Sequence, residues 1–214
     1  MRRSILFAII VLATATAWGQ NDKFTDAMLT VFERSATART LDEHQEVANS
    51  FARIAMAETN EWTPLYYAAL NNLMMSFMEI SDDQKGKFIS LAKSQIEAGL
   101  KLKPEETELM VLKILSYYAQ MALNPMDAMY MFGEVNALID HARTLNPDNP
   151  RIYLTQAEAV FNMPPEFGGG GVAAKPLLTT AMEKFNRFVP EGPLSPDWGK
   201  ERCEMLLNQI EQGR

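Results

Sequence analysis

QIEAGLKLKP, residues 95–104, contains the pattern that decides the fold, because the same pattern returns as LIDHARTLNP at residues 138–147. Each stretch places small or apolar side chains three and four residues apart and ends on a proline. This spacing puts those side chains on one stripe of a helix, where a second helix can pack closely. The two stretches therefore predict the same kind of helix in two successive units.

Two further stretches, ARIAMAETN and AMEKFNRFVP, have similar spacing, and the first ends on an asparagine and the second on a proline. The four endings fall at Asn60, Pro104, Pro147 and Pro190, which are 44, 43 and 43 positions apart. The stripe that they share consists of Ala48, Ala52 and Ala55; Ala92, Ile96 and Gly99; Val135, Ile139 and Ala142; and Leu178, Met182 and Phe185. A period of about 43 residues predicts helical hairpins that stack on one another.

Helix-start signals divide the chain between these endings. Thr40 and Ser81 are each followed three residues later by Glu43 or Gln84, which is the pattern of a capping box. A capping residue precedes a proline in four places: Thr63, Asn124, Asn149 and Ser195. We also expect Trp62 to pack on Tyr67. The predicted helices span 23–37, 41–58, 64–80, 82–102, 106–122, 125–145, 150–162, 172–188 and 196–212. Strand patterns are almost absent, so the sequence predicts an all-α fold.

The helix endings resemble the tetratricopeptide repeat, most closely in EAGLKLKPEETELMVL (97–112) and DHARTLNPDNPRIYLTQAEAVF (140–161). The resemblance covers about residues 23–212. It implies a right-handed superhelix of about four helical hairpins and a C-terminal capping helix. Extended repeats of this type resemble secreted tetratricopeptide proteins of the Bacteroidetes. Because the period exceeds the usual length of about 34 residues, a HEAT-like array and an ordinary helical bundle stay open as alternatives.

Residues 1–19 predict a Sec-type signal peptide. Arg2 and Arg3 precede an apolar stretch at 5–12, and small residues follow before Gln20. The apolar stretch is too short to cross a bilayer as a helix. We therefore expect cleavage before Gln20, one domain over 20–214, and an exported, periplasmic protein without membrane insertion. A buried N-terminal helix is the alternative.

The charge and the cysteine content exclude some classes of partner. The chain has 27 acidic and 20 basic residues, a net charge of −7, so it is a poor ligand for nucleic acids and anionic membranes. Cys203 is the single cysteine, which excludes an internal disulfide. We expect Cys203 to be buried and the chain to be a monomer, with a disulfide-linked dimer as the alternative.

GGGGVAAK, residues 168–175, formally satisfies the Gly-x-Gly-x-x-Ala dinucleotide pattern. That pattern needs a preceding strand, and Pro164 and Pro165 exclude a central strand there. Pro176 follows Lys175 where a P-loop has serine or threonine. The glycines are therefore predicted to form a turn between two helices. An anion resting on the amides at the start of the following helix is the alternative.

No set of residues forms a recognisable catalytic or metal site. His44 and His141 are the only histidines and are expected to be solvated or satisfied by neighbouring groups. Paired acids such as Glu105 and Glu106 stand at helix N-termini, where the macrodipole favours them. We therefore expect no enzymatic activity, no cofactor and no metal.

The 14 methionines are harder to assign. Met126, Met129 and Met131 resemble the thioether runs of copper(I) sites, but Met126 and Met129 also have ordinary helical spacing. We expect them to pack in the core. A deformable binding surface is the alternative, since thioethers adapt to varied ligands.

The resemblance to tetratricopeptide repeats implies a concave groove lined by the first helix of each hairpin. Transferring its groove positions selects Tyr67, Asn71, Met74, Glu108, Val111, Leu115, Tyr118, Arg151, Leu154, Glu158 and Asn162. Tyrosines beside aliphatic and hydrogen-bonding side chains suit a peptide or protein segment. We expect a non-enzymatic protein–protein interaction scaffold. An accessory ligand-binding subunit of a periplasmic solute transport system is the alternative.

Overall fold

The structure, a computed structural model, describes residues 22–213, so the predicted signal peptide and its cleavage site lie outside the described residues. Every regular element within this range is a helix, which confirms the all-α prediction. After a helix over residues 22–37, the α-helices are α2 (Leu41–Ala57), α3 (Thr63–Ser76), α4 (Asp82–Leu102), α5 (Thr107–Leu123), α6 (Ala128–Leu145), α7 (Pro150–Asn162), α8 (Gly171–Phe185) and α9 (Lys200–Glu211). Short 3-10 turns at Pro125–Asp127 and Pro165–Phe167 precede α6 and α8.

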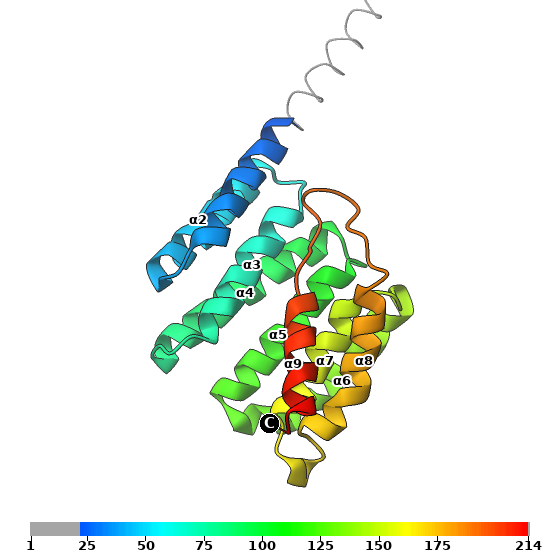
Figure 1. Cartoon of the computed structure of the whole chain (residues 1–214). Coiled ribbons are helices and arrows are strands. Elements are labelled where there is room, and N and C mark those ends of the chain that lie inside the picture. The colour runs from blue at the N-terminus through cyan, green and yellow to red at the C-terminus, as the bar shows by residue number, and fades with distance from the viewer. Residues whose placement is uncertain (1–21, 214) are drawn as a thin grey trace, which may run out of the picture.

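The helices form antiparallel hairpins that stack side by side, followed by α9 as a single last helix (Figure 1). The helix over 22–37 pairs with α2, α3 with α4, α5 with α6, and α7 with α8. The first helices of successive hairpins also touch, because α3 packs on α5 and α5 packs on α7. The arrangement is compatible with a tetratricopeptide-like repeat, while the right-handed superhelix stays a prediction.

The hairpin turns and the turns between hairpins lie at opposite ends of the stack. The turns that join α3 to α4, α5 to α6 and α7 to α8 follow one edge, at the bottom left of Figure 1. The connections between hairpins and residues 186–199, which lead into α9, lie at the other end. The hairpin turns and residues 186–199 therefore lie at separate ends of the stack.

Both predicted capping boxes are present. The Thr40 side chain accepts from the Glu43 amide, and the Ser81 side chain accepts from the Gln84 amide. In each case the residue at N3 also binds back to the cap, which satisfies two of the backbone donors that a helix start leaves free. Asn149 caps α7 by accepting from the Arg151 amide. These starts were therefore readable from local sequence.

Three predicted helix starts are wrong. α6 begins at Ala128 rather than residue 125, because Pro125–Asp127 form a 3-10 turn and the Asn124 side chain makes no cap hydrogen bond. The cap of α3 is Trp62, not Thr63, and its indole packs edge-on against Tyr66 rather than Tyr67, with ring centroids 5.8 Å apart. The last helix begins at Lys200 rather than residue 196, because Ser195 accepts from the Gly192 amide in a turn of its own. The predicted helices 64–80 and 172–188 also end early, at Ser76 and Phe185.

The predicted stripe of small and apolar residues lies in the core. Nine of its members are buried: Ala48, Ala92, Ile96, Gly99, Val135, Ile139, Ala142, Leu178 and Phe185. Ala52, Ala55 and Met182 are partly buried. Gly99 lies against α5, where a Cβ would stand 2.9 Å from the methyl carbons of Leu109, so α4 and α5 pack this closely only with glycine there.

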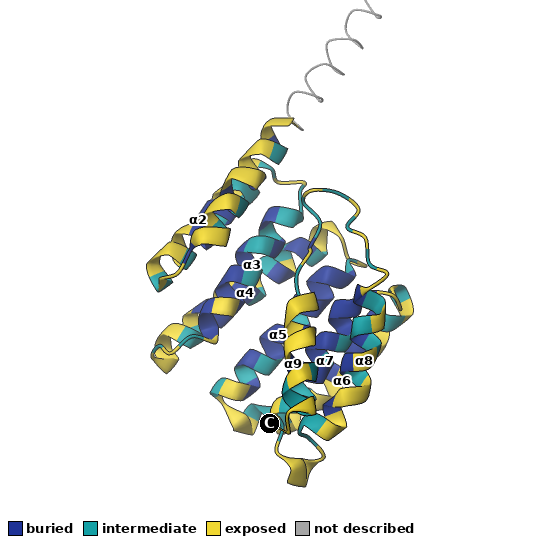
Figure 2. Cartoon of the chain, viewed as in Figure 1, coloured by how far each residue is buried: buried dark blue, intermediate teal, exposed yellow. Residues whose placement is uncertain are grey.

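The core is divided along the stack. One cluster of buried side chains joins α3, α4, α5 and α6 and takes in Ile152 of α7. Another joins α7, α8 and α9 and contains Cys203, which is buried as expected. Figure 2 shows α5, which packs between α3 and α7, as a largely buried helix, whereas the helix over 22–37 and α9 expose their outer faces.

Candidate functional site

A buried polar network lies where the first helices of successive hairpins begin. Arg151 of α7 donates from Nη1 to Glu108 of α5 at 3.0 Å, and both side chains are buried. Asn149 donates to the same Glu108 oxygen at 2.9 Å. A buried charge is tolerated only when it is paired and hydrogen-bonded, and this pair meets both conditions.

Residues 186–199, here called the return segment, close this network. Arg151 Nη2 donates to the Pro196 carbonyl at 2.5 Å, and Tyr67 donates to the Leu194 carbonyl at 3.1 Å. The Trp198 indole donates to the Tyr66 hydroxyl at 2.6 Å. The guanidinium of Arg151 also lies 4.6 Å from the ring centroid of Phe188. Side chains on α3 and α7 thus bind backbone carbonyls of the chain's own extended segment.

Burial dominates the electrostatics of the network. It raises the pKa of Glu108 from 4.5 to about 7, although the Arg151 guanidinium opposes the shift. Burial and the Glu108 charge also raise the pKa values of Tyr66 and Tyr67 above their ordinary range. These phenols are therefore neutral hydrogen-bonding groups at physiological pH.

The predicted partner groove therefore needs correction where its residues are buried. Several of its residues are buried and cannot touch a partner in this structure: Asn71, Glu108, Val111, Leu115, Arg151 and Leu154. The physical reasons differ along the groove. The return segment covers Arg151, α9 packs near Leu154, and Val111 and Leu115 belong to the core cluster of α3–α6. Glu158 is partly exposed, but its carboxylate forms an ion pair with Arg202 of α9 at 2.7 Å.

Five of the predicted groove residues keep solvent contact. Met74 and Asn162 are exposed, and Tyr67, Tyr118 and Glu158 are partly exposed. Met74 and Asn162 stand in the last turns of α3 and α7, next to the hairpin turns. The part of the predicted groove that stays open thus leads onto the edge formed by those turns.

That edge exposes large apolar side chains, and we call it the tip surface. Its members come from three successive hairpins: Met74, Phe77, Met126, Met129, Tyr130, Phe132, Phe167 and Val172. The densest group is at the α5–α6 turn, where Met126, Met129 and Tyr130 are 69%, 70% and 79% exposed. A concentration of apolar side chains that the fold leaves uncovered is typical of an interaction surface.

The expectation that Met126 and Met129 pack in the core is wrong. Met126 lies in the 3-10 turn rather than in α6, so the two residues do not share the helical face that their spacing predicted. Met131 alone of the three packs against the core cluster of α3–α6. The methionine run was the only sequence feature that pointed to this group, and such a run is compatible with a core and with an exposed surface.

The glycine-rich turn lies on the same edge, and its backbone amides are hydrogen-bonded to carbonyls nearby in the chain. Gly168 and Gly170 have φ values of 84° and 89°, which favour glycine. Their amides donate to the Pro165 and Val160 carbonyls, at 2.9 Å each. No strand precedes this turn in the described chain, so the prediction of a turn between two helices is confirmed.

Within residues 22–213, no three His, Cys, Asp or Glu side chains gather in a way that could hold a metal ion. Over the same range, no helix has both the length and the apolar character needed to cross a membrane. A shallow depression lined by Asp82, Lys87, Ser90, Leu91 and Ser94 lies along α4 alone. The tip surface is therefore the candidate site with the broadest support.

Compared with known proteins, the sequence matches no family model and no curated protein sequence. Among solved structures, the HusA haemophore from Porphyromonas gingivalis is similar, with a TM-score of 0.73. The two chains share a fold. The superposition covers 90% of this chain and 93% of that chain at 22% sequence identity. The shared all-helical fold thus extends over nearly all of both chains.

Proposed function

We propose that this chain is an exported, non-enzymatic binding protein that acts as a monomer and holds a protein or peptide partner on its tip surface. The observation that carries the proposal is the exposed group Met126, Met129 and Tyr130 at the centre of an apolar edge. Methionine and aromatic side chains are enriched in protein interfaces, and thioethers adapt to varied partner surfaces. The secretory pattern of residues 1–19 supports export to the periplasm.

The return segment also supports this assignment. Tyr67 and Arg151 have the groove positions that would bind a peptide backbone, but they already bind the Leu194 and Pro196 carbonyls. A partner at that end would have to displace a segment tied to a buried ion pair. A partner at the hairpin turns displaces only water.

Photo-crosslinking in the native host tests the proposal. A photoreactive residue at position 129 should capture the same partner repeatedly, and Met126→Ser with Tyr130→Ser should abolish capture. Val189→Ser is the matched control, because Val189 is equally exposed but lies in the return segment at the other end. Capture that survives the tip variants, or that is lost equally in the control, would refute the assignment.

A second candidate is binding of a haem-type ligand, favoured by the likeness to a haemophore. The exposed thioethers of Met126 and Met129 and the phenol of Tyr130 are side chains able to ligate iron. Titration of the full chain with haemin should then give a saturable shift of the haem absorption band. That shift should be lost when Met126, Met129 and Tyr130 are all replaced by serine. A band that grows without saturation would remove this candidate.

A further inference from the structure

The tip surface combines apolar exposure with an excess of negative charge. Its members lie on three segments, residues 74–87, 124–134 and 162–175. Together they contain six acidic residues, Glu79, Asp82, Asp83, Asp127, Glu134 and Glu166, and three basic ones, Lys85, Lys87 and Lys175. Lys85 is already engaged with Asp82 at 3.6 Å.

The central segment, 124–134, has both the densest apolar exposure and two acids without a basic residue of its own. Neutral donors orient both carboxylates. Asp127 accepts from Gln120 at 2.8 Å and from Asn124 at 2.9 Å, and Glu134 accepts from the Tyr117 hydroxyl. Neither carboxylate is in an ion pair with a described residue, so both keep their charge available to a partner.

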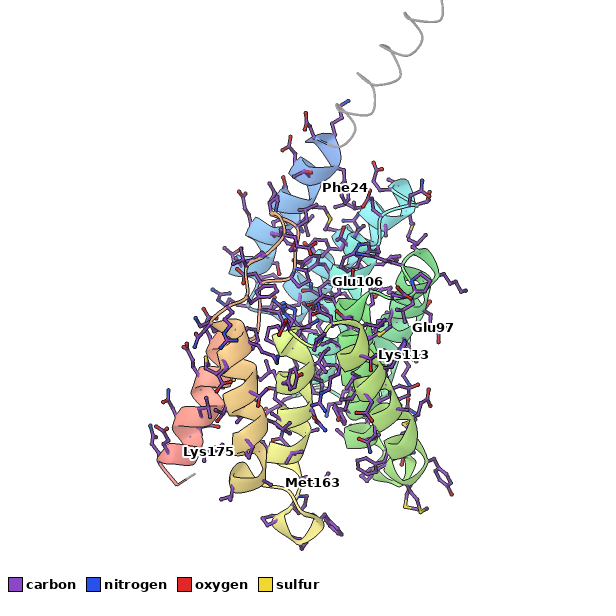
Figure 3. The ribbon with its side chains drawn as sticks, turned by 90° about the vertical axis from the view of Figure 1, so that its right-hand side faces the viewer. Phe24, Glu97, Glu106, Lys113, Met163 and Lys175 are labelled. Atoms are coloured by element: carbon purple, nitrogen blue, oxygen red, sulfur yellow. The ribbon has the colours of Figure 1, made fainter. Side chains whose placement is uncertain are left out.

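Other charged groups approach this segment from α4 and α5. Lys93 donates to Gln120 and lies close enough to interact with Asp127 and Glu134, so its single charge offsets part of their two. Glu97 and Lys113 act on Lys93 with opposite signs and therefore offset each other. Figure 3 shows Glu97 and Lys113 away from Met163, which marks the end of the stack where the hairpin turns lie. The net charge of the side chains around the α5–α6 turn stays negative.

We infer that the partner of the tip surface is a polypeptide segment that presents large apolar side chains among lysines or arginines. This inference rests on the proposed function. Apolar side chains of such a segment would pack on Met126, Met129 and Tyr130, while its cations would lie near Asp127 and Glu134. Charge complementarity of this kind selects partners and speeds their association. The same charge works against anionic partners, including a lipid surface and the propionates of haem.

Two synthetic peptides of about 18 residues, matched in amphipathic leucine pattern, test the inference with the full chain. One carries lysines on its polar face and the other carries glutamates. The lysine peptide should bind at least about tenfold more tightly by fluorescence anisotropy, with the difference shrinking in about 0.5 M salt. Asp127→Asn together with Glu134→Gln should remove most of that preference.

Asp140→Asn is the matched control, because Asp140 is an exposed acid on the same helix, about three turns from the hairpin turn. It should leave the preference unchanged. Equal binding of both peptides, no binding of either, or equal effects of the tip and control variants would overturn the inference. Crosslinking at position 129 would then show separately whether the tip surface still captures a partner of another chemistry.

Discussion

Glu108 and Arg151 are 43 residues apart in sequence and 3.0 Å apart in space, since they occupy the same position in successive hairpins. Tyr66, 42 residues before Glu108, hydrogen-bonds the same carboxylate at 3.4 Å. The repeat period therefore places side chains from three hairpins in one buried cluster. Because the first helices stack on one another, a constant sequence interval becomes a direct contact.

Breaking this ion pair from one side should be costly. Arg151→Met leaves Glu108 buried without its cation, so we expect a loss of about 3 kcal/mol in the free energy of unfolding. Urea denaturation at pH 8, where Glu108 is ionised, measures it. Arg151→Met with Glu108→Leu removes both charges and should recover most of the loss. A double variant no more stable than the single one would contradict this account.

Stability should depend on pH through Glu108. Its folded pKa of about 7 lies above the ordinary 4.5, so the native state holds the proton more tightly than the unfolded state does. The stabilisation from this group is complete below pH 4.5 and is lost as the pH rises through 7. We expect the free energy of unfolding to fall by about 2 kcal/mol between pH 5 and pH 8. Glu108→Gln should flatten this slope, and an unchanged slope would assign the pH dependence to other groups.

Two helical glycines should respond to alanine with opposite signs. Gly99→Ala places a methyl group 2.9 Å from Leu109 and should cost about 1–3 kcal/mol. Gly133 lies in α6, and a Cβ added there would meet nothing within 4 Å, so Gly133→Ala should stabilise by up to about 1 kcal/mol. Thermal unfolding of both variants checks the pair. Similar changes in both would mean that α4 and α5 are not closely packed at Gly99.

The Cys203 thiol should be inert in the folded chain. It is buried, its Sγ donates to the Leu178 carbonyl at 3.3 Å, and its pKa is raised to about 11, with burial as the main cause. A thiol reagent at pH 8 should react only after denaturation, whereas a Ser90→Cys variant, exposed on α4, should react at once. Rapid reaction of the native chain, or a disulfide-linked dimer on a non-reducing gel, would contradict this placement.

The periodic parts of the sequence predicted their own structure well. The capping boxes at Thr40 and Ser81 and the buried stripe through Ile96 and Ile139 are properties of local sequence, since the groups involved lie within a few residues of each other. Thr63 shows the limit of such signals. Its hydroxyl is buried without a hydrogen-bond partner because Trp62 takes the cap position and packs on Tyr66.

The sequence alone determined an all-helical chain of hairpins with a period of about 43 residues, because helix starts, endings and apolar stripes depend on neighbours along the chain. The tertiary structure decided which predicted groove residues meet solvent. Leu194 and Pro196 come back to Tyr67 and Arg151 from more than 40 residues away, and no local pattern encodes that contact. It also decided that Met126 and Met129 face outward, since an apolar side chain has the same spacing in a core and on an uncovered surface.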